Sequence, residues 1–182
     1  PSDQAEEPGD DILVAAYQAG QESALLRLFE RHRPALFSYL TRLTEGHGDA
    51  QDLFQETWLR AIRNLPRFRA GHFRAWLYRI GHNLAVDRNR TQNRFQSLDQ
   101  PLEESDGETG RDRLPDRGPD PAALASERDL GRTLQGLLAT LPEAQREVFL
   151  LRTEAHLPFR EIARLQGVSI NTALAGMQYA ID

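Results

Sequence analysis

The sequence predicts an all-α protein with two small helical domains joined by an acidic, flexible linker. Apolar residues recur at helical spacing before residue 96 and again after residue 121. The stretch between them, residues 97–121, carries eight acids and three arginines and has no aromatic or β-branched apolar residue. A segment of this composition cannot bury enough apolar surface to form a core, so it is expected to act as a tether.

Residues 10–96 are predicted to form a helical bundle, and residues 1–9 an acidic tail. Pro34 is expected to divide the second apolar stripe from the third, since proline is disfavoured inside a helix. The polar stretch 44–49 should separate the third stripe from the fourth, and Pro66 should end the fourth. The expected stripes run from Ile12 to Tyr17, Leu25 to Phe29, Leu36 to Leu43, Leu53 to Leu65 and Phe73 to Leu84.

Residues 122–182 carry a helix-turn-helix pattern. Pro142 fits the first turn of one helix, and Pro158 precedes a short helix over 159–166. Gly167 can adopt the left-handed conformation of a tight turn, and Ser169 can cap the next helix. In a DNA-binding unit, Asn171 and Thr172 would then lie closest to base edges in the major groove. A plain helical hairpin has the same pattern and stays an alternative.

Positive charge is concentrated between Arg60 and Arg94. This stretch holds nine arginines against one acid, Asp87, in a chain of net charge −5. On the helix that starts at Phe73, the side away from Trp76 offers an asparagine that could read a base and arginines that could hold phosphates. The residues of that side are Arg79, Asn83, Asp87 and Arg90.

The preceding loop, PRFRAGHF, places arginines beside aromatic residues. Such a loop could hold an unstacked base, or Phe68 and Phe73 could instead anchor it on the core. The sequence favours neither. Trp58 and Trp76 fall on apolar stripes and are predicted to belong to the core.

The predicted helix over 50–65 has Asp52, Gln55, Glu56 and Leu59 on one face. This face could dock on a basic helix of a partner. A solvated charged surface is the alternative.

Several classes of protein are disfavoured. No apolar run approaches the roughly 20 residues that a membrane span needs, so we expect a cytoplasmic protein without membrane insertion. The absence of cysteine excludes disulfides and thiolate zinc sites. The five histidines lack the H-x-x-x-H and HExxH spacings, and no nucleophile–base motif or phosphate-binding glycine loop is present. We therefore expect no metal, no cofactor and no enzymatic activity.

The motifs together resemble bacterial RNA polymerase sigma factors of the extracytoplasmic-function (ECF) group. They are DAQDLFQETWLRAIRNLPRF, FRAWLYRIGHNLAVDRNR, the acidic linker, LPEAQREVFLLR and FREIARLQGVSINT, in that order. The resemblance implies a σ2-like domain over 10–96 that binds the clamp helices of the polymerase β′ subunit and opens the −10 promoter element. It also implies a σ4-like domain over 122–182 that binds the β flap and reads the −35 element. An anti-sigma protein that covers the same surfaces is a further expected partner.

The same resemblance assigns site residues. Polymerase binding falls on Asp52, Gln55, Glu56 and Leu59. Contacts with the −10 element fall on Phe68, Arg69, His72, Phe73, Arg79, Asn83, Asp87, Arg88 and Arg90, where the loop from Phe68 to Phe73 would hold a flipped base. Contacts with the −35 element fall on Ser169, Asn171, Thr172, Ala175 and Gln178.

The last predicted helix departs from the family pattern. Residues 169–182 contain no basic residue, and Leu174 and Gly176 stand where relatives commonly place one. We expect Gly176 to face the groove, so Gly176→Arg should raise both stability and duplex binding. A stand-alone helix-turn-helix regulator, in which the first domain senses a signal or dimerises, is the second interpretation of the chain.

Overall fold

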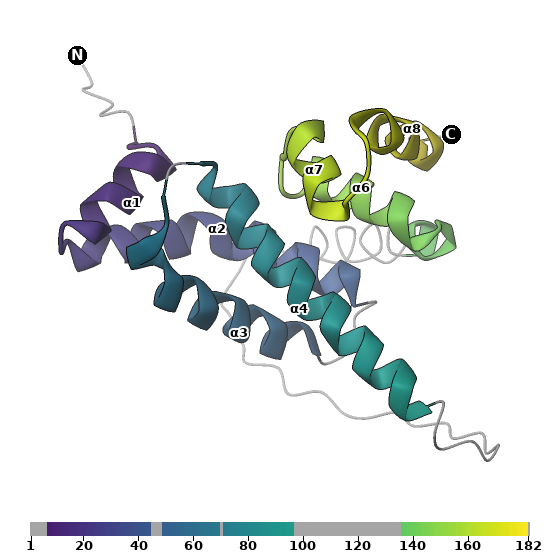
Figure 1. Ribbon diagram of the computed structural model, residues 1–182, viewed down its shortest axis with the longest axis horizontal. Coiled ribbons are helices and arrows are strands. Elements are labelled where there is room, and N and C mark those ends of the chain that lie inside the picture. Colours follow the sequence, from purple (N-terminus) through teal and green to yellow (C-terminus); the bar gives the residue numbers. More distant parts are fainter. Residues whose placement is uncertain (1–6, 45–48, 70, 97–135, 182) are drawn as a thin grey trace, which may run out of the picture.

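The computed structural model describes residues 7–44, 49–69, 71–96 and 136–181, and these residues are all helix, turn or loop. The helices form two groups, which we call the N-terminal half (residues 7–96) and the C-terminal half (residues 136–181) (Figure 1). The predicted all-α fold is confirmed. The predicted acidic linker, residues 97–121, and the tail residues 1–6 lie outside the described residues.

The N-terminal half is built from four helices and a short 3-10 turn. Their bounds are α1 Asp10–Gln18, α2 Glu22–Leu43, α3 Asp49–Asn64, the turn η1 Leu65–Arg67, and α4 Phe73–Gln96. Each helix buries one apolar stripe, and Leu28, Leu36, Leu40, Leu65, Leu77, Tyr39 and Tyr78 are fully buried. Trp58 is 4 % exposed, in agreement with its predicted place in the core.

The prediction that Pro34 separates two helices is wrong. Pro34 lies inside α2, which continues without a break from Glu22 to Leu43. Leu28 before the proline and Leu36 after it are both completely buried against the same core. We infer that this packing outweighs the loss of one backbone hydrogen bond at the proline. Pro66 does end α3, as predicted, because the chain turns through η1 directly after Asn64.

Helices α2, α3 and α4 cross closely at Gly81. A Cβ added there would lie 3.3 Å from both Leu40 Cδ2 and Thr57 Oγ1. Thr57 is buried and its hydroxyl donates to the Leu53 carbonyl at 2.6 Å. Gly81 thus permits the approach that brings α4 across the other two helices.

The C-terminal half contains a helical segment over 136–140, then α6 Glu143–Thr153, α7 Phe159–Gln166 and α8 Ile170–Ile181. Its core is formed by Val148, Leu150, Leu151, Ile162 and Ala173, each at most 3 % exposed. Gly167 has φ +69° and ends α7 in the left-handed conformation, and the Thr172 backbone N–H donates to Ser169 Oγ at 3.0 Å. The predicted turn and cap are both confirmed.

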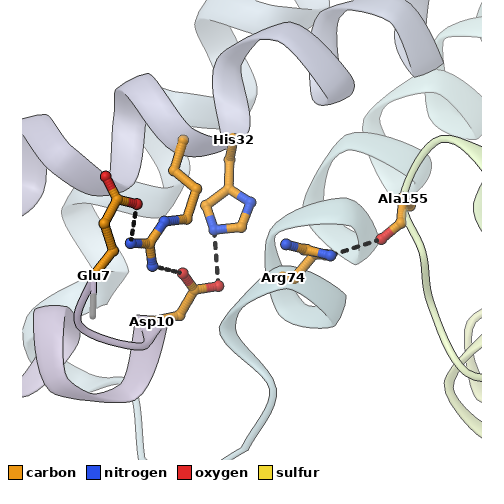
Figure 2. A network of polar contacts seen from close by, with 6 residues as sticks. Glu7, Asp10, His32, Arg74 and Ala155 are labelled. Atoms are coloured by element: carbon orange, nitrogen blue, oxygen red, sulfur yellow. Dashed lines mark hydrogen bonds and ion pairs between the residues drawn. The ribbon is translucent and has the colours of Figure 1, made fainter. Parts of the chain in front are cut away.

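A charged network joins α1 to α2 at the start of the fold (Figure 2). Asp10 accepts from Arg31 Nη1 at 2.8 Å and lies 2.8 Å from Nε2 of the buried His32, and Arg31 also contacts Glu7. Burial raises the pKa of the Asp10 carboxyl, but the hydrogen bonds with His32 and Arg31 outweigh it and hold that pKa at about 2, below the ordinary 3.8. The ionised form of Asp10 therefore stabilises the folded protein.

We expect Asp10→Asn to lower the free energy of unfolding by about 2 kcal/mol at pH 7. Because the pKa of Asp10 is lower in the folded state than in the unfolded state, this stabilisation is complete above about pH 5 and is lost as the pH falls toward 2. Urea unfolding of both proteins over a pH series from 7 to 2 measures the difference. A difference that stays constant down to pH 2 would contradict the role of the ionised carboxylate.

Candidate nucleic-acid interface and partner surface

The outward side of α4 presents the residues predicted to read DNA. Arg79, Asn83, Asp87 and Arg90 are exposed, whereas Leu77, Leu84 and Ala85 on the opposite side are buried. Arg79 and Arg90 form no ion pair within the described part of the chain. We call these four exposed residues the base-reading face. An exposed asparagine between two unpaired arginines could contact a base edge while the arginines hold phosphates.

Arg88, also predicted to contact the −10 element, is tied to the start of α3. Its guanidinium lies 3.4 Å from Asp49 Oδ1 and 3.7 Å from Asp52 Oδ2, and it donates to the Asp49 carbonyl at 3.3 Å. These contacts connect the predicted DNA surface with the predicted polymerase surface. A phosphate would have to compete with two carboxylates for the Arg88 guanidinium. The position of Arg88 therefore supports a role in joining α4 to α3, besides any contact with DNA.

The loop before α4 is anchored by its aromatic residues. Phe73 is 2 % exposed and packs on Trp76 and His32, with ring centroids 5.7 and 5.4 Å apart. Phe68 is half-buried, 4.9 Å from the Trp76 ring. The assignment of Phe73 to DNA contact is corrected accordingly, because a ring enclosed by the core cannot stack on a base. Arg69 and His72 of this loop are exposed and remain available.

A cleft of about 740 Å³ separates this loop from α7. Basic side chains line it from both halves of the protein: Arg67, Arg69 and Arg79 from one side, Arg160 and Arg164 from the other. Glu161 also lines the cleft and pairs with Arg164 at 2.8 Å. The cleft is therefore strongly positive.

The predicted polymerase face on α3 is accessible and is partly paired within the helix. Asp52 has a side-chain exposure of 69 %, and Gln55 and Leu59 are also exposed. Glu56, 41 % exposed, forms an ion pair with Arg60 at 2.8 Å. A basic partner would thus meet two carboxylates that each have a neighbouring arginine, Arg88 at 3.7 Å from Asp52 and Arg60 at 2.8 Å from Glu56.

Sequence reasoning missed the apolar part of this surface. A groove of about 970 Å³ runs between α2 and α3, and its walls include Phe37, Phe54, Trp58 and Ile62. Phe37 is 43 % exposed and Ile62 is 37 % exposed, although both lie within the apolar stripes from Leu36 to Leu43 and from Leu53 to Leu65. We call the face with Asp52, Gln55, Glu56, Leu59, Phe37 and Ile62 the partner surface. An exposed apolar groove with a polar rim is suited to a helix laid along it.

All five residues predicted to contact the −35 element are exposed around the turn and along α8: Ser169, Asn171, Thr172, Ala175 and Gln178. The hydroxyl of Ser169 is engaged in the helix cap and lies 2.8 Å from Thr172 Oγ1. Ala173 is buried and marks the inward side of the helix. The outward side of α8 therefore carries no charged residue, as the sequence indicates.

Gly176 does not face outward, contrary to the prediction. A Cβ at this position would lie 3.5 Å from Val148 Cγ2 of α6, so the glycine belongs to the packed side of α8. The reason is helical periodicity: residue 176 follows the buried Ala173 by three positions. The side chain of an arginine at this position would start in contact with α6 rather than in the groove of the duplex. Gly176→Arg is therefore not expected to increase duplex binding.

We instead expect Gly176→Ala to raise the free energy of unfolding by about 1 kcal/mol, because alanine is the better helix former and its Cβ meets Val148 at an ordinary contact distance. Urea unfolding of the full chain measures this, and binding to promoter duplex should stay unchanged. As a comparison, Gln178→Arg on the exposed side should steepen the dependence of log affinity on log salt by about 0.9. A loss of stability in Gly176→Ala would contradict the placement of the glycine.

In the C-terminal half, the arginines that line the cleft lie on α7, and α8 carries no basic residue. Arg160 is exposed, as is Arg164, and both face the cleft described above. The sequence pattern predicted a short helix over 159–166 but assigned no role to its arginines. The arginines of this helix alternate in the sequence with Ile162, Ala163 and Leu165. This alternation could have indicated that the arginines lie on the exposed side.

Two structural findings concern other classes of function. Within the described residues, no group of three or more histidine and acidic side chains is placed to hold a metal ion. None of the described helices combines the length and apolarity of a membrane span.

Comparisons with known proteins match both halves to one family. The family model of Sigma-70 region 2 matches residues 28–95, and that of Sigma-70, region 4 matches residues 131–173. RNA polymerase sigma factor CarQ of Myxococcus xanthus is 31 % identical over 158 residues, which cover 86 % of this chain and 84 % of CarQ. ECF RNA polymerase sigma factor SigE of Mycolicibacterium smegmatis is 30 % identical over 173 residues, with 91 % of this chain but 64 % of SigE covered.

Solved structures agree with the fold. CnrH, solved in complex with the cytosolic domain of CnrY, aligns with a TM-score of 0.64 at 25 % identity, covering 94 % of this chain and 91 % of CnrH. The sigma factor RpoE of Bartonella quintana, solved with the anti-sigma factor NepR, aligns with a TM-score of 0.65 at 22 % identity, covering 86 % and 91 %. Two regions matched in order, and a relative above 30 % identity covered over most of its length, show that the chain belongs to the extracytoplasmic-function group of sigma-70 factors.

Proposed function

We propose that this protein binds core RNA polymerase through the partner surface and directs it to promoters through the base-reading face and the helix-turn-helix. The observation that carries the proposal is the adjacency of two different surfaces on one bundle. Arg88 of α4, the neighbour of Asp87 in the base-reading face, contacts Asp52 of the partner surface, so the two surfaces lie side by side. Polymerase bound to one would hold DNA close to the other.

Each half of the protein is proposed to contact a different promoter element. We propose a σ2-like domain over 10–96 and a σ4-like domain over 122–182, joined by the linker at 97–121. Asn83 is proposed to contact a base of the −10 element, with Arg79 and Arg90 on phosphates. Asn171, Thr172, Ala175 and Gln178 are proposed to approach the −35 element, and the exposed Arg160 of α7 offers the backbone contact that α8 lacks.

Partners follow from the same surfaces. The apolar groove on α2 and α3, together with Asp52 and Glu56 on α3, is proposed to fit the β′ clamp helices, and the C-terminal half would meet the β flap. Because CnrH and RpoE were each solved with a protein bound, we propose that an anti-sigma factor holds this chain as well. The protein would act in the cytoplasm with the polymerase, without a cofactor or catalytic activity of its own.

Copurification separates this function from that of a stand-alone regulator, which the family membership does not favour. The full chain, tagged and mixed with purified core polymerase, should elute with it as a complex. A chain that binds promoter duplex alone and never associates with core polymerase would overturn the proposal.

A further inference from the structure

Helix α1 contacts both ends of the loop before α4. Its Leu13 and Val14 are buried and fix the helix on the bundle. Neither the base-reading face nor the partner surface includes a residue of α1. Its polar residues Asp10 and Gln18, one at each end of the helix, nevertheless make contacts that lead to the loop.

The Gln18 amide joins the last residue of α1 to the turn that leads into the loop. Its Nε2 atom donates to the Leu65 carbonyl at 2.9 Å and to the Phe68 carbonyl at 2.8 Å. Leu65 begins η1 and Phe68 directly follows it, and the Phe68 backbone N–H also donates to the Leu65 carbonyl at 3.1 Å. A side-chain amide has two N–H donors. Both donors of Gln18 are therefore used to fix the point where the chain leaves the turn.

The first residue of α1 fixes the other end of the loop through His32. Asp10 lies 2.8 Å from Nε2 of the buried His32 (Figure 2). The His32 ring in turn packs on Phe73, the first residue of α4, with ring centroids 5.4 Å apart. Asp10 and His72 also line one pocket of about 650 Å³. Helix α1 is thus tied to the residues before and after the loop.

The side chains that the loop offers to DNA lie between these two anchors. Arg69 and His72 are exposed, and Phe68 is half-buried against Trp76 with ring centroids 4.9 Å apart. Their positions depend on where the backbone enters and leaves the loop. Groups that recognise a ligand have to be held within about 0.5 Å of the productive geometry, and hydrogen bonds from neighbouring residues supply this precision.

We propose that α1 is a brace for the loop before α4 and that Gln18 is a positioning residue for the opening of the −10 element. Gln18 does not contact DNA. It holds Phe68 and Arg69 where an unstacked base can meet them. The inference rests on the proposed function, because it takes this loop as the place where a base of the −10 element is held.

The exposure of Gln18 separates its effect on the loop from its effect on the fold. The Gln18 side chain is open to water, so its hydrogen bonds replace bonds to water and contribute little net stability. The buried Leu13 and Val14 keep α1 in place without them. Loss of the Gln18 donors should therefore loosen the start of the loop and leave the bundle intact.

The first test uses the free full chain. Gln18→Met keeps the length of the side chain and removes both donors. The readout is quenching of tryptophan emission by acrylamide, because Phe68 packs on Trp76 whereas Trp58, the other tryptophan, lies in the core. We expect Gln18→Met to increase quenching at an unchanged urea midpoint. Gln21→Met is the matched control, since Gln21 is exposed and its side chain forms no capping hydrogen bond.

The second test uses the chain bound to core polymerase, on promoter DNA from a start site mapped with this complex. Affinity for the closed duplex and the rate of strand opening are measured separately. Gln18→Met should slow opening by about fivefold or more, because a displaced contact group loses much of its effect, and should leave both duplex affinity and polymerase binding unchanged. Gln18→Glu has the same shape but places a carboxylate against two carbonyl oxygens, so it should slow opening further.

Three results would overturn the brace. They are quenching in Gln18→Met equal to that in Gln21→Met, an unchanged rate of opening, and a loss of duplex affinity as large as the loss in rate, which would indicate a general structural defect. Failure of the wild-type complex to open any promoter would instead contradict the proposed function. The quenching experiment needs neither DNA nor polymerase, so the two failures are distinguishable.

Discussion

Reversal of both acids on the partner surface, Asp52→Arg with Glu56→Arg, is expected to weaken binding to core polymerase by at least tenfold. The clamp helices are proposed to be basic, so the reversal replaces attraction with repulsion, and like charges at an interface cost several kcal/mol. Glu56 already pairs with Arg60, and its replacement also places two arginines four positions apart. Asp52 likewise lies near Arg88, so each reversal also leaves one arginine of the chain without its acidic partner.

Binding is measured by titration of labelled chain with core polymerase at a fixed salt concentration. Asp11→Arg with Glu22→Arg is the matched control, because both residues are exposed and acidic and lie outside the partner surface. The control should bind as the wild type does. Equal losses in the two double variants would indicate a general charge effect and contradict the assignment of the surface.

Asn83→Ala and Arg90→Ala are expected to affect promoter binding in different ways. Loss of a bidentate contact to a base costs about 1–3 kcal/mol and relaxes the preference at one position. Loss of a phosphate contact weakens all sequences alike and reduces the salt dependence by about one unit. Both side chains are exposed, so neither change should disturb the fold.

The measurement is binding of polymerase with each variant to matched and singly mismatched promoter DNA over a salt series. Arg88→Ala is the informative comparison, because Arg88 also pairs with Asp49 and Asp52. It should lower stability as well as affinity. If Asn83→Ala and Arg90→Ala reduce affinity equally on matched and mismatched DNA, the base-reading face lies elsewhere.

The sequence predicted the helices well where periodicity and turn chemistry agree. The turn at Gly167 and the cap at Ser169 depend on local backbone conformation. The residue types at these two positions are therefore enough to predict them. Pro34 shows the limit of such reasoning. Local propensity predicts a break there, but packing of α2 along its whole length overrides it.

The partner surface was predicted less completely than the helices. The exposure of a side chain depends on which helices pack against it, and periodicity does not determine this. Phe37 and Ile62 look like core residues on a helical stripe, but both line the groove between α2 and α3 and are exposed there. The contacts of the buried Glu147 of α6 with α2 and α4 could not be predicted at all. Its partners Tyr39 and His82 lie 108 and 65 positions away, and no periodicity relates them.

The most direct test of the proposed function is transcription reconstituted with the full chain and core polymerase on genomic DNA, followed by sequencing of the transcript 5′ ends. We expect discrete start sites that appear only with the chain present, share −35 and −10 elements upstream, and weaken with Asp52→Arg combined with Glu56→Arg. The same start sites with core polymerase alone, or no defined starts although the complex forms, would contradict it.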